Sequence, residues 1–425
     1  MKKADSTPTP DTPTVSHPSD EMFEQKMVEN QREQQSKLTR FLRVSIVVVG
    51  AIIAVYVAVL GVLFLMGWTA EPWPFHKSDS VETAQADPID LSTWSDEELA
   101  AQLCMVMVSS AEPSQIDTWT GRCVGAVLLK GENPAGELSK KIAAAQKKVP
   151  YGVSAFIASD EEGGQKQPLK SLCGPLASAQ EMGTWTSAEI EDATKTYGLK
   201  LKDVGVNLVL APSVDLGAKN GALTRAGRTF GSDVDTVSAC AHAWISGMSK
   251  AGISTALKHW PGIGGYKDVS GALVSFNAWS ACEQTSVLAF KKTISAATKM
   301  VLVTHVVIPE LCEDDKPATI SAEALKYLRA DAGDGTIILA DDVDALAKRK
   351  IETSSSQAAV DALIAGADMV MLTPTSTSDR VVIEAIAQAI ASGKLSRAQA
   401  EVSVARIIRA KAQMGLSPAL ATRTQ

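Results

Sequence analysis

The strongest constraint on the fold is a repeated alternation of short apolar runs with longer amphipathic segments. The runs are nearly continuous in hydrophobic, often β-branched residues, which is typical of parallel strands buried on both faces. The segments between most of them have helical spacing, as in "TVSACAHAWISGMSKAG" and "SSSQAAVDALIAGA". The apolar runs are residues 103–109, 124–130, 153–160, 206–213, 254–261, 300–307, 336–343 and 367–373. Eight strands with helical crossovers predict an α/β fold of the (β/α)8, TIM-like barrel class.

A doubly wound open sheet is the alternative architecture. It is less favoured because no glycine-rich phosphate-binding loop follows the first apolar run. The globular part is expected to begin near residue 91, where "STWSDEEL" offers a Ser N-cap followed by acidic residues. We therefore predict one barrel domain over residues 91–425.

An uncharged apolar segment at residues 44–68 predicts a single transmembrane helix, because it is long enough to cross a hydrocarbon core about 30 Å thick. Lys37, Arg40 and Arg43 precede it, whereas the first charge after it is Glu71. This bias predicts a cytoplasmic N-terminus and an extracytoplasmic C-terminal part. A cleaved signal peptide is the alternative, but the apolar run is longer than those of signal peptides.

These observations predict a single-pass protein of the plasma membrane. A polar, partly disordered cytoplasmic tail would cover residues 1–43, the membrane helix 44–68, a proline-containing linker 69–90 and the extracytoplasmic barrel 91–425. The formal charge of −7 argues against nucleic acid as a partner.

The six cysteines all follow the apolar segment. An even number in an oxidising compartment favours disulfides, and proximity in the sequence suggests the pairs Cys104–Cys123 and Cys282–Cys312. Buried free thiols are the alternative. No C-x-x-C motif or Cys/His cluster points to a metal, and nothing in the chain indicates a cofactor.

Polar side chains gather where the predicted strands end. Active sites of (β/α)8 barrels lie at these C-terminal strand ends. A charged group there costs free energy unless it is paired or solvated, so their coincidence predicts a polar pocket. Taken singly, each has a structural alternative, such as a packing histidine, a helix-capping aspartate or a turn. The fourth run ends in "APSVD", and the other strand ends carry Asp160, Glu161, Glu162, Lys258, His259, His305, Asp341 and Asp342.

The polar loops belong to an ordered series of motifs: "DEEGG" followed by Q and L, "NLVLAPSVDL", "RTFGSD", "KHWPGIG", "TH" and "LADDVDA". Together they resemble the catalytic barrel of glycoside hydrolase family 3, especially its single-domain β-N-acetylglucosaminidases. The resemblance covers roughly residues 95–415. It implies a retaining glycosidase whose substrate is a carbohydrate containing N-acetylglucosamine.

The resemblance also implies roles for individual residues. Asp341 matches the family nucleophile, whose carboxylate attacks the anomeric carbon and forms a glycosyl-enzyme ester. Fixed charged donors and acceptors suit the hydroxyl groups of a pyranose ring. The expected substrate-binding residues are Asp160, Arg228, Lys258, His259 and His305.

The acid/base motif departs from the family pattern. In those glucosaminidases a His, oriented by an Asp two residues before it, transfers the proton. When this chain is aligned with the family motif without gaps, Gly271 stands at the position of the His and Val269 at that of the Asp. Asp268 or Glu162 could serve as a substitute acid, and Asp268 is the more attractive because it lies in the corresponding loop. A solvated turn residue is the alternative for Asp268.

The preferred interpretation is therefore a membrane-anchored, extracytoplasmic β-N-acetylhexosaminidase acting on cell-envelope glycans, with peptidoglycan as the nearby substrate by analogy. A catalytically impaired carbohydrate-binding pseudo-hydrolase is the alternative, because the His/Asp pair is not kept. A third and weaker hypothesis is a member of the same family with another substrate preference, such as a β-glucosidase.

Overall fold

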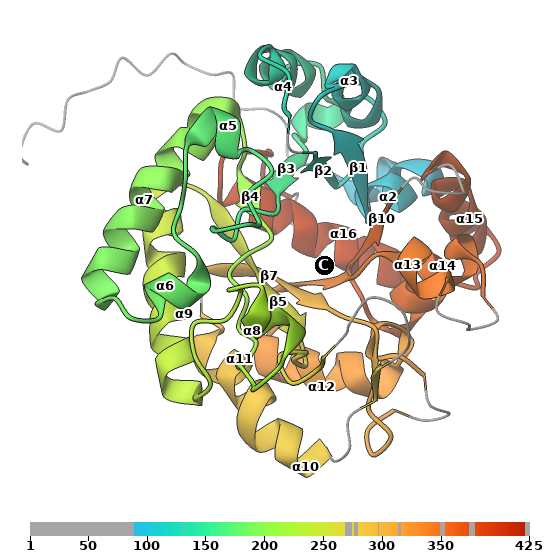
Figure 1. The fold of residues 1–425 in the computed structure, drawn as a ribbon. Helices are drawn as coiled ribbons and strands as arrows, with labels where there is room; N and C mark the ends of the chain where they lie inside the picture. Colours follow the sequence, from blue (N-terminus) through green and yellow to red (C-terminus); the bar gives the residue numbers. More distant parts are fainter. Residues whose placement is uncertain are drawn as a thin grey trace, which may run out of the picture. The chain divides into compact units, whose positions relative to one another are not determined.

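A closed parallel β-barrel forms the centre of the molecule. The computed structural model describes residues 89–131, 133–267, 274–275, 279–295, 297–312, 316–348, 353–373 and 379–420. In this part of the chain the strands close in the order β1-β10-β9-β7-β5-β4-β3-β2 (Figure 1). They are β1 (Cys104–Ser109), β2 (Ala126–Lys130), β3 (Phe156–Ser159), β4 (Leu208–Val209), β5 (Ser254–Trp260), β7 (Thr298–Val303), β9 (Ile337–Ala340) and β10 (Met369–Leu372). Each strand overlaps one of the apolar runs, so the predicted (β/α)8 barrel is confirmed.

The sixth apolar run divides between two sheets. After β7 the chain leaves the barrel and forms β8 (Val306–Val307), which pairs in parallel with β6 (Val274–Ser275). This small sheet is not predictable from the sequence, because an apolar run does not reveal where its strand changes partner.

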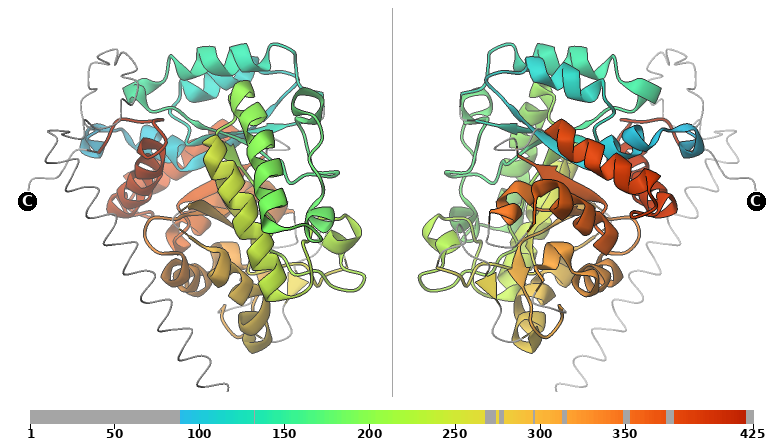
Figure 2. Two further views of the ribbon diagram at one scale, coloured as in Figure 1. Left: turned by 90° about the vertical axis from the view of Figure 1, so that its left-hand side faces the viewer. Right: turned by 90° about the vertical axis from the view of Figure 1, so that its right-hand side faces the viewer.

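Helices surround the strands (Figures 1 and 2). They are α2 (Asp96–Gln102), α3 (Ser114–Thr120), α4 (Leu138–Gln146), α5 (Lys170–Cys173), α6 (Ala179–Met182), α7 (Ser187–Val204), α8 (Ala222–Arg225), α9 (Val234–Ala251), α10 (Trp279–Cys282), α11 (Leu288–Thr293), α12 (Ala322–Ala332), α13 (Val343–Ala347), α14 (Ser355–Ala365), α15 (Asp379–Ala391) and α16 (Arg397–Ala412). The predicted N-cap of the first is confirmed, because the Ser95 hydroxyl accepts from the Glu98 N–H while the Glu98 carboxylate accepts from the Ser95 N–H.

Helix α16 and the residues after it close one end of the barrel. The Leu416 carbonyl accepts from the Ser154 N–H at 2.8 Å, just before β3, and Met414 Sδ lies 2.8 Å from the Ser254 hydroxyl at the start of β5. These contacts lie at the N-terminal ends of the strands, and α16 passes behind the barrel in Figure 1. The open end is therefore the C-terminal one, where the polar loops lie.

The predicted disulfides are wrong: all six cysteines are buried free thiols. Their sulfur atoms face other partners. Cys104 donates to the Ala100 carbonyl at 3.3 Å, and Cys282 lies 3.3 Å from the Ser286 hydroxyl. Burial raises the pKa of Cys282 to about 11, so this thiol stays protonated at neutral pH.

The transmembrane helix expected at residues 44–68 lies outside the described residues, as do the tail before it and most of the linker after it. Among the residues that are described, no helix combines the length and apolar character needed to cross a membrane. The anchor therefore stays a prediction.

A buried lysine lies at the closed end of the barrel. Lys411 of α16 is fully buried and donates to the Gln102 side-chain oxygen at 2.5 Å. Its ammonium lies 5.3 Å from the centre of the Phe156 ring. No carboxylate of the described residues pairs with it, and burial lowers its pKa from 10.5 to about 7.

This lysine predicts a pH dependence of stability. Above pH 7 the unfolded chain still binds a proton at residue 411 that the folded protein releases, so the free energy of unfolding rises as the pH increases toward about 10. The contribution is at most about 1.4 kcal/mol per pH unit. Urea unfolding at pH 6.5, 8 and 9.5 should show this component in the wild type and its loss in Lys411→Met. Lys148→Met, at an exposed site, is the control; an unchanged pH slope in Lys411→Met would contradict the assignment.

Candidate active site

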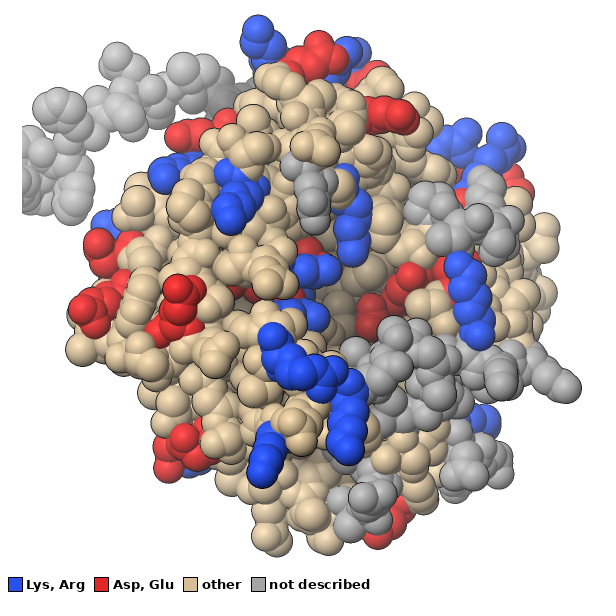
Figure 3. All heavy atoms as spheres, in the orientation of Figure 1, with Lys and Arg blue, Asp and Glu red and all other residues tan. Residues whose placement is uncertain are grey.

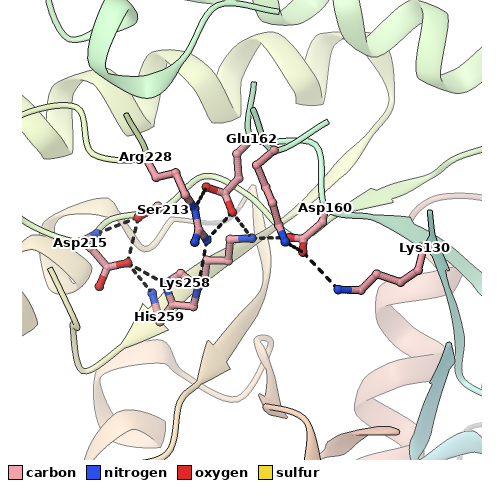
Figure 4. A network of polar contacts seen from close by, with 9 residues as sticks. Lys130, Asp160, Glu162, Ser213, Asp215, Arg228, Lys258 and His259 are labelled. Carbon is pink, nitrogen blue, oxygen red and sulfur yellow. Dashed lines mark hydrogen bonds and ion pairs between the residues drawn. The ribbon is translucent and has the colours of Figure 1, made fainter. Parts of the chain in front are cut away.

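The candidate site lies at the C-terminal mouth of the barrel. Figure 3 shows this face hollowed at its centre, with acidic and basic side chains in the wall of the hollow. Figure 4 shows a network of charged side chains from the ends of β2, β3, β4 and β5. The mouth therefore brings together charges that are far apart in the sequence.

The loop after β3 presents two carboxylates to the mouth and buries a third. Glu161 accepts from the Ser159 hydroxyl at 2.7 Å, the Leu169 N–H at 2.9 Å and the Tyr197 hydroxyl of α7 at 2.7 Å. Because Glu161 is held by these donors, its neighbours on either side, Asp160 and Glu162, face the network instead (Figure 4).

Lys258, the fifth residue of β5, lies between these two carboxylates. It is 2% exposed, pairs with Asp160 and lies 2.5 Å from Glu162. Arg228 binds the same Glu162 through two hydrogen bonds, of 2.8 and 2.7 Å. This paired geometry is the strong form of a guanidinium–carboxylate contact and fixes the orientation of both groups.

The network keeps its charges despite burial. Burial alone would raise the pKa of Asp160, but the ammonium groups of Lys258, Lys166 and Lys130 hold it well below its usual range. Burial likewise disfavours the charge on Lys258, yet its carboxylate neighbours raise its pKa above the ordinary value. The carboxylates and cations are thus ionised together at neutral pH.

A carboxylate from another loop orients His259. Asp215, fully buried after β4, accepts from His259 Nδ1 at 2.7 Å, the Ser213 hydroxyl at 2.8 Å and the Ile263 N–H at 2.6 Å. The other ring nitrogen, Nε2, lies 3.5 Å from Arg228. The ring is therefore held in one orientation beside the ion network.

Asp341 follows β9 on the same rim. Its N–H donates to the Val303 carbonyl at 3.0 Å, which continues the barrel pairing. Its carboxylate accepts from the Asp342 N–H at 2.9 Å and lies 3.4 Å from the Thr304 hydroxyl. The alternative role of a helix-capping aspartate is filled by its neighbour Asp342, whose side chain accepts from the Asp344 N–H and caps α13. Asp341 is left partly exposed at the mouth.

His305, predicted to bind the substrate with the others, lies outside the ion network. It is 1% exposed, Nε2 donates to the Asp342 carbonyl at 2.9 Å, and Nδ1 lies 3.0 Å from the Thr319 hydroxyl. Both ring nitrogens thus contact groups of the protein, and the bond to the Asp342 carbonyl ties His305 to the loop after β9. The packing alternative for this histidine is the one observed.

The structure brings Asp160, Arg228, Lys258 and His259 together, as expected, and adds Glu162 and Asp215 as their partners. From the sequence alone Glu162 is a polar strand-end residue and a candidate substitute acid, and Asp215 is assigned no role. A weak signal existed for both, since Glu162 stands beside Asp160 in the loop after one apolar run and Asp215 ends the motif "NLVLAPSVD" after another. Asp268, Val269 and Gly271 lie outside the described residues.

Asp160 and Glu162 pair with cations of the protein, whereas Asp341 accepts from an N–H and lies near a hydroxyl. In the part of the chain that is described, no group of three or more His, Cys, Asp or Glu side chains could hold a metal ion. The described side chains of this mouth offer a polar molecule hydrogen-bond donors and acceptors, charged groups and the carboxylate of Asp341.

Comparison with known proteins agrees with this geometry. The model for "Glycosyl hydrolase family 3 N terminal domain" matches residues 96–410. "Beta-hexosaminidase LpqI" of Mycobacterium tuberculosis is 30% identical over 323 residues, which cover 73% of this chain and 81% of LpqI.

Solved structures agree as well. The structure of "M tuberculosis LpqI" has a TM-score of 0.68 at 26% identity and covers 75% of this chain and 94% of its own. A "Beta-N-acetylhexosaminidase from Beutenbergia cavernae" has a TM-score of 0.65 at 27% identity, covering 78% of this chain and 99% of its own.

The ion network predicts a large stability effect at Glu162. Glu162→Gln would leave Lys258 and Arg228 buried without their shared negative charge, and we expect a loss of about 3 kcal/mol in the free energy of unfolding. Glu191→Gln is the matched control, because Glu191 pairs with Lys250 at the surface, where solvent screens the pair, and it should lose much less stability. Equal losses in chemical denaturation would contradict the network's role.

Proposed function

This chain belongs to glycosyl hydrolase family 3 and is a β-hexosaminidase-like glycosidase; from this premise we propose that it is a retaining β-N-acetylhexosaminidase with Asp341 as its nucleophile. The observation that supports this most is the position of Asp341 relative to the ion network. The strands β3 and β9 are separated by β4, β5 and β7 in one direction and by β2, β1 and β10 in the other. Asp160 and Asp341 thus follow opposite strands of the barrel and face one mouth.

This arrangement suits a single pyranose ring. The network of Asp160, Arg228, Lys258 and His259 offers charged donors and acceptors to ring hydroxyls, so the sugar would be oriented before reaction. Asp341, across the mouth, would then attack the anomeric carbon and form a glycosyl ester. Water would release the sugar with retained configuration.

Protonation of the leaving group is proposed to fall to Asp268. The family's usual His and Asp are replaced by Gly271 and Val269, and Asp268 is the acidic residue nearest to them in the sequence. Glu162 is the weaker candidate, because Arg228 and Lys258 stabilise its ionised form and lower its pKa. Since the relatives with similar barrels are named as hexosaminidases, a non-catalytic carbohydrate-binding protein is not the preferred proposal.

The proposed site of action is the cell envelope. The uncharged segment at residues 44–68, with Lys37, Arg40 and Arg43 before it, supports a single-pass anchor with the barrel outside. A hexosaminidase held there would meet glycans of the envelope that contain N-acetylglucosamine, and peptidoglycan is the substrate we propose.

The nucleophile is tested with an aryl N-acetyl-β-glucosaminide, whose leaving group needs little protonation. We expect hydrolysis by the full-length protein and a loss of at least about 10³-fold in kcat for Asp341→Asn, because the covalent step is removed. Asp235→Asn changes an exposed carboxylate that pairs with Lys292 and should act like the wild type. Wild-type turnover by Asp341→Asn would rule out the assigned nucleophile.

The acid is tested by varying the leaving group. For Asp268→Asn we expect kcat/KM for an N-acetylglucosamine disaccharide to fall by about 10²-fold or more, since general acid catalysis is worth about 10²–10⁴-fold. For a dinitrophenyl glycoside the loss should be less than about 3-fold, because that leaving group departs unprotonated. If both substrates lose rate equally, Asp268 is not the acid.

A further inference from the structure

Asp160 is surrounded by more positive charge than it can neutralise. One oxygen pairs with Lys258, and the other lies 3.2 Å from the Lys166 ammonium and 3.7 Å from that of Lys130. Lys130 ends β2 and reaches toward Asp160 (Figure 4), whereas Lys166 comes from the loop after β3. Three ammonium groups from separate segments thus converge on a single carboxylate.

The surplus charge is located on the two outer lysines. Glu162 already compensates Arg228 and shares Lys258 with Asp160. Among the described residues, Asp160 is the one carboxylate within 4 Å of Lys130 or Lys166. Asp215 is directed to His259 instead. Ionised together, the two carboxylates and four cations of this cluster leave two positive charges uncompensated.

These two lysines are also accessible. Their side chains are 35% and 37% exposed, whereas that of Lys258 is 3% exposed. Lys258 and Glu162 already hold Asp160 and Arg228 in place, so the outer pair is not needed to neutralise a buried charge. Like charges that gather at a partly open rim repel one another, and an anion placed between them removes this repulsion.

We propose that Lys130 and Lys166 form a subsite for an anionic ester, a sulfate or a phosphate, on the sugar that the mouth binds. This deepens the proposed function and rests on it. In the proposed binding mode the Asp341 carboxylate lies near the anomeric carbon, and Asp160 lies near the opposite edge of the sugar ring. Lys130 and Lys166 surround Asp160, so they lie beside that opposite edge, which carries C4 and C6. The enzyme then prefers a terminal N-acetylglucosamine that is charged at one of these positions.

Binding to the full-length protein tests the subsite without requiring turnover. Isothermal titration would compare N-acetylglucosamine with its 6-sulfate, 4-sulfate and 6-phosphate. We expect at least one ester to bind about 5- to 20-fold more tightly than the neutral sugar at low salt, since two charge-assisted contacts are gained. High salt should reduce this preference. The isomer that binds most tightly identifies the position and the kind of ester.

Variants connect the preference to the lysines. Lys130→Met with Lys166→Met should reduce the affinity ratio of ester to neutral sugar to less than about 2, whereas the two Lys→Arg changes should keep it. Lys148→Met, which removes a more exposed lysine that pairs with Asp117, should leave the ratio unchanged. A thermal melt of each variant separates loss of fold from loss of binding. Equal affinities for ester and neutral sugar in the wild type, or an unchanged ratio in the double Met variant, would overturn the proposal.

Measurements of turnover distinguish failure of the anion subsite from failure of the proposed hexosaminidase function. If the neutral aryl glycoside is hydrolysed and the esters show no preference, the subsite is refuted and the hexosaminidase function stands. If no aryl glycoside is hydrolysed but an ester binds through the lysines, the function is refuted and the anion subsite stands.

Discussion

The site depends on the pairing of the buried Lys258 ammonium with two carboxylates from the loop after β3. A charge with 2% exposure is tolerated only when opposite charges and hydrogen bonds replace its water. The contact therefore ties the end of β5 to the end of β3, and Arg228 is held through Glu162. His259, the next residue along β5, is oriented in turn by Asp215. The two ion pairs of Lys258 thus fix Asp160, Glu162 and, through Glu162, Arg228.

The two buried lysines of the described chain show how the ends of the barrel differ. Lys258, at the open end, has carboxylate partners that raise its pKa. Lys411, at the closed end, has an amide oxygen and an aromatic ring, and burial lowers its pKa to about 7. The same residue type is therefore held in its charged form at the open mouth, whereas burial weakens its hold on the proton where α16 covers the strands. In a parallel barrel this asymmetry follows from the common direction of all strands.

Most of the fold could be predicted from the sequence, but less of the candidate site could. The apolar runs identified every barrel strand, and the strand ends identified Asp160, Lys258, His259 and Asp341. The cysteine pairs were wrong because spacing in the sequence carries no information on where a sulfur atom points. His305 was assigned to the sugar although it bonds to Asp342 and Thr319 inside the protein. Asp215 was missed because only the fold brings it against His259.

By itself the sequence determined the strand and helix order, the barrel class and the resemblance that names the family, because these depend on periodicity and on short motifs read along the chain. Only the tertiary structure decided which charges meet: that Glu162 is shared by Lys258 and Arg228, that Glu161 is bonded away from the mouth, and that two further lysines converge on Asp160. The reason is physical. The energy of a charge in a protein is set by neighbours within a few ångströms, and closure of the barrel supplies these neighbours from strands distant in sequence.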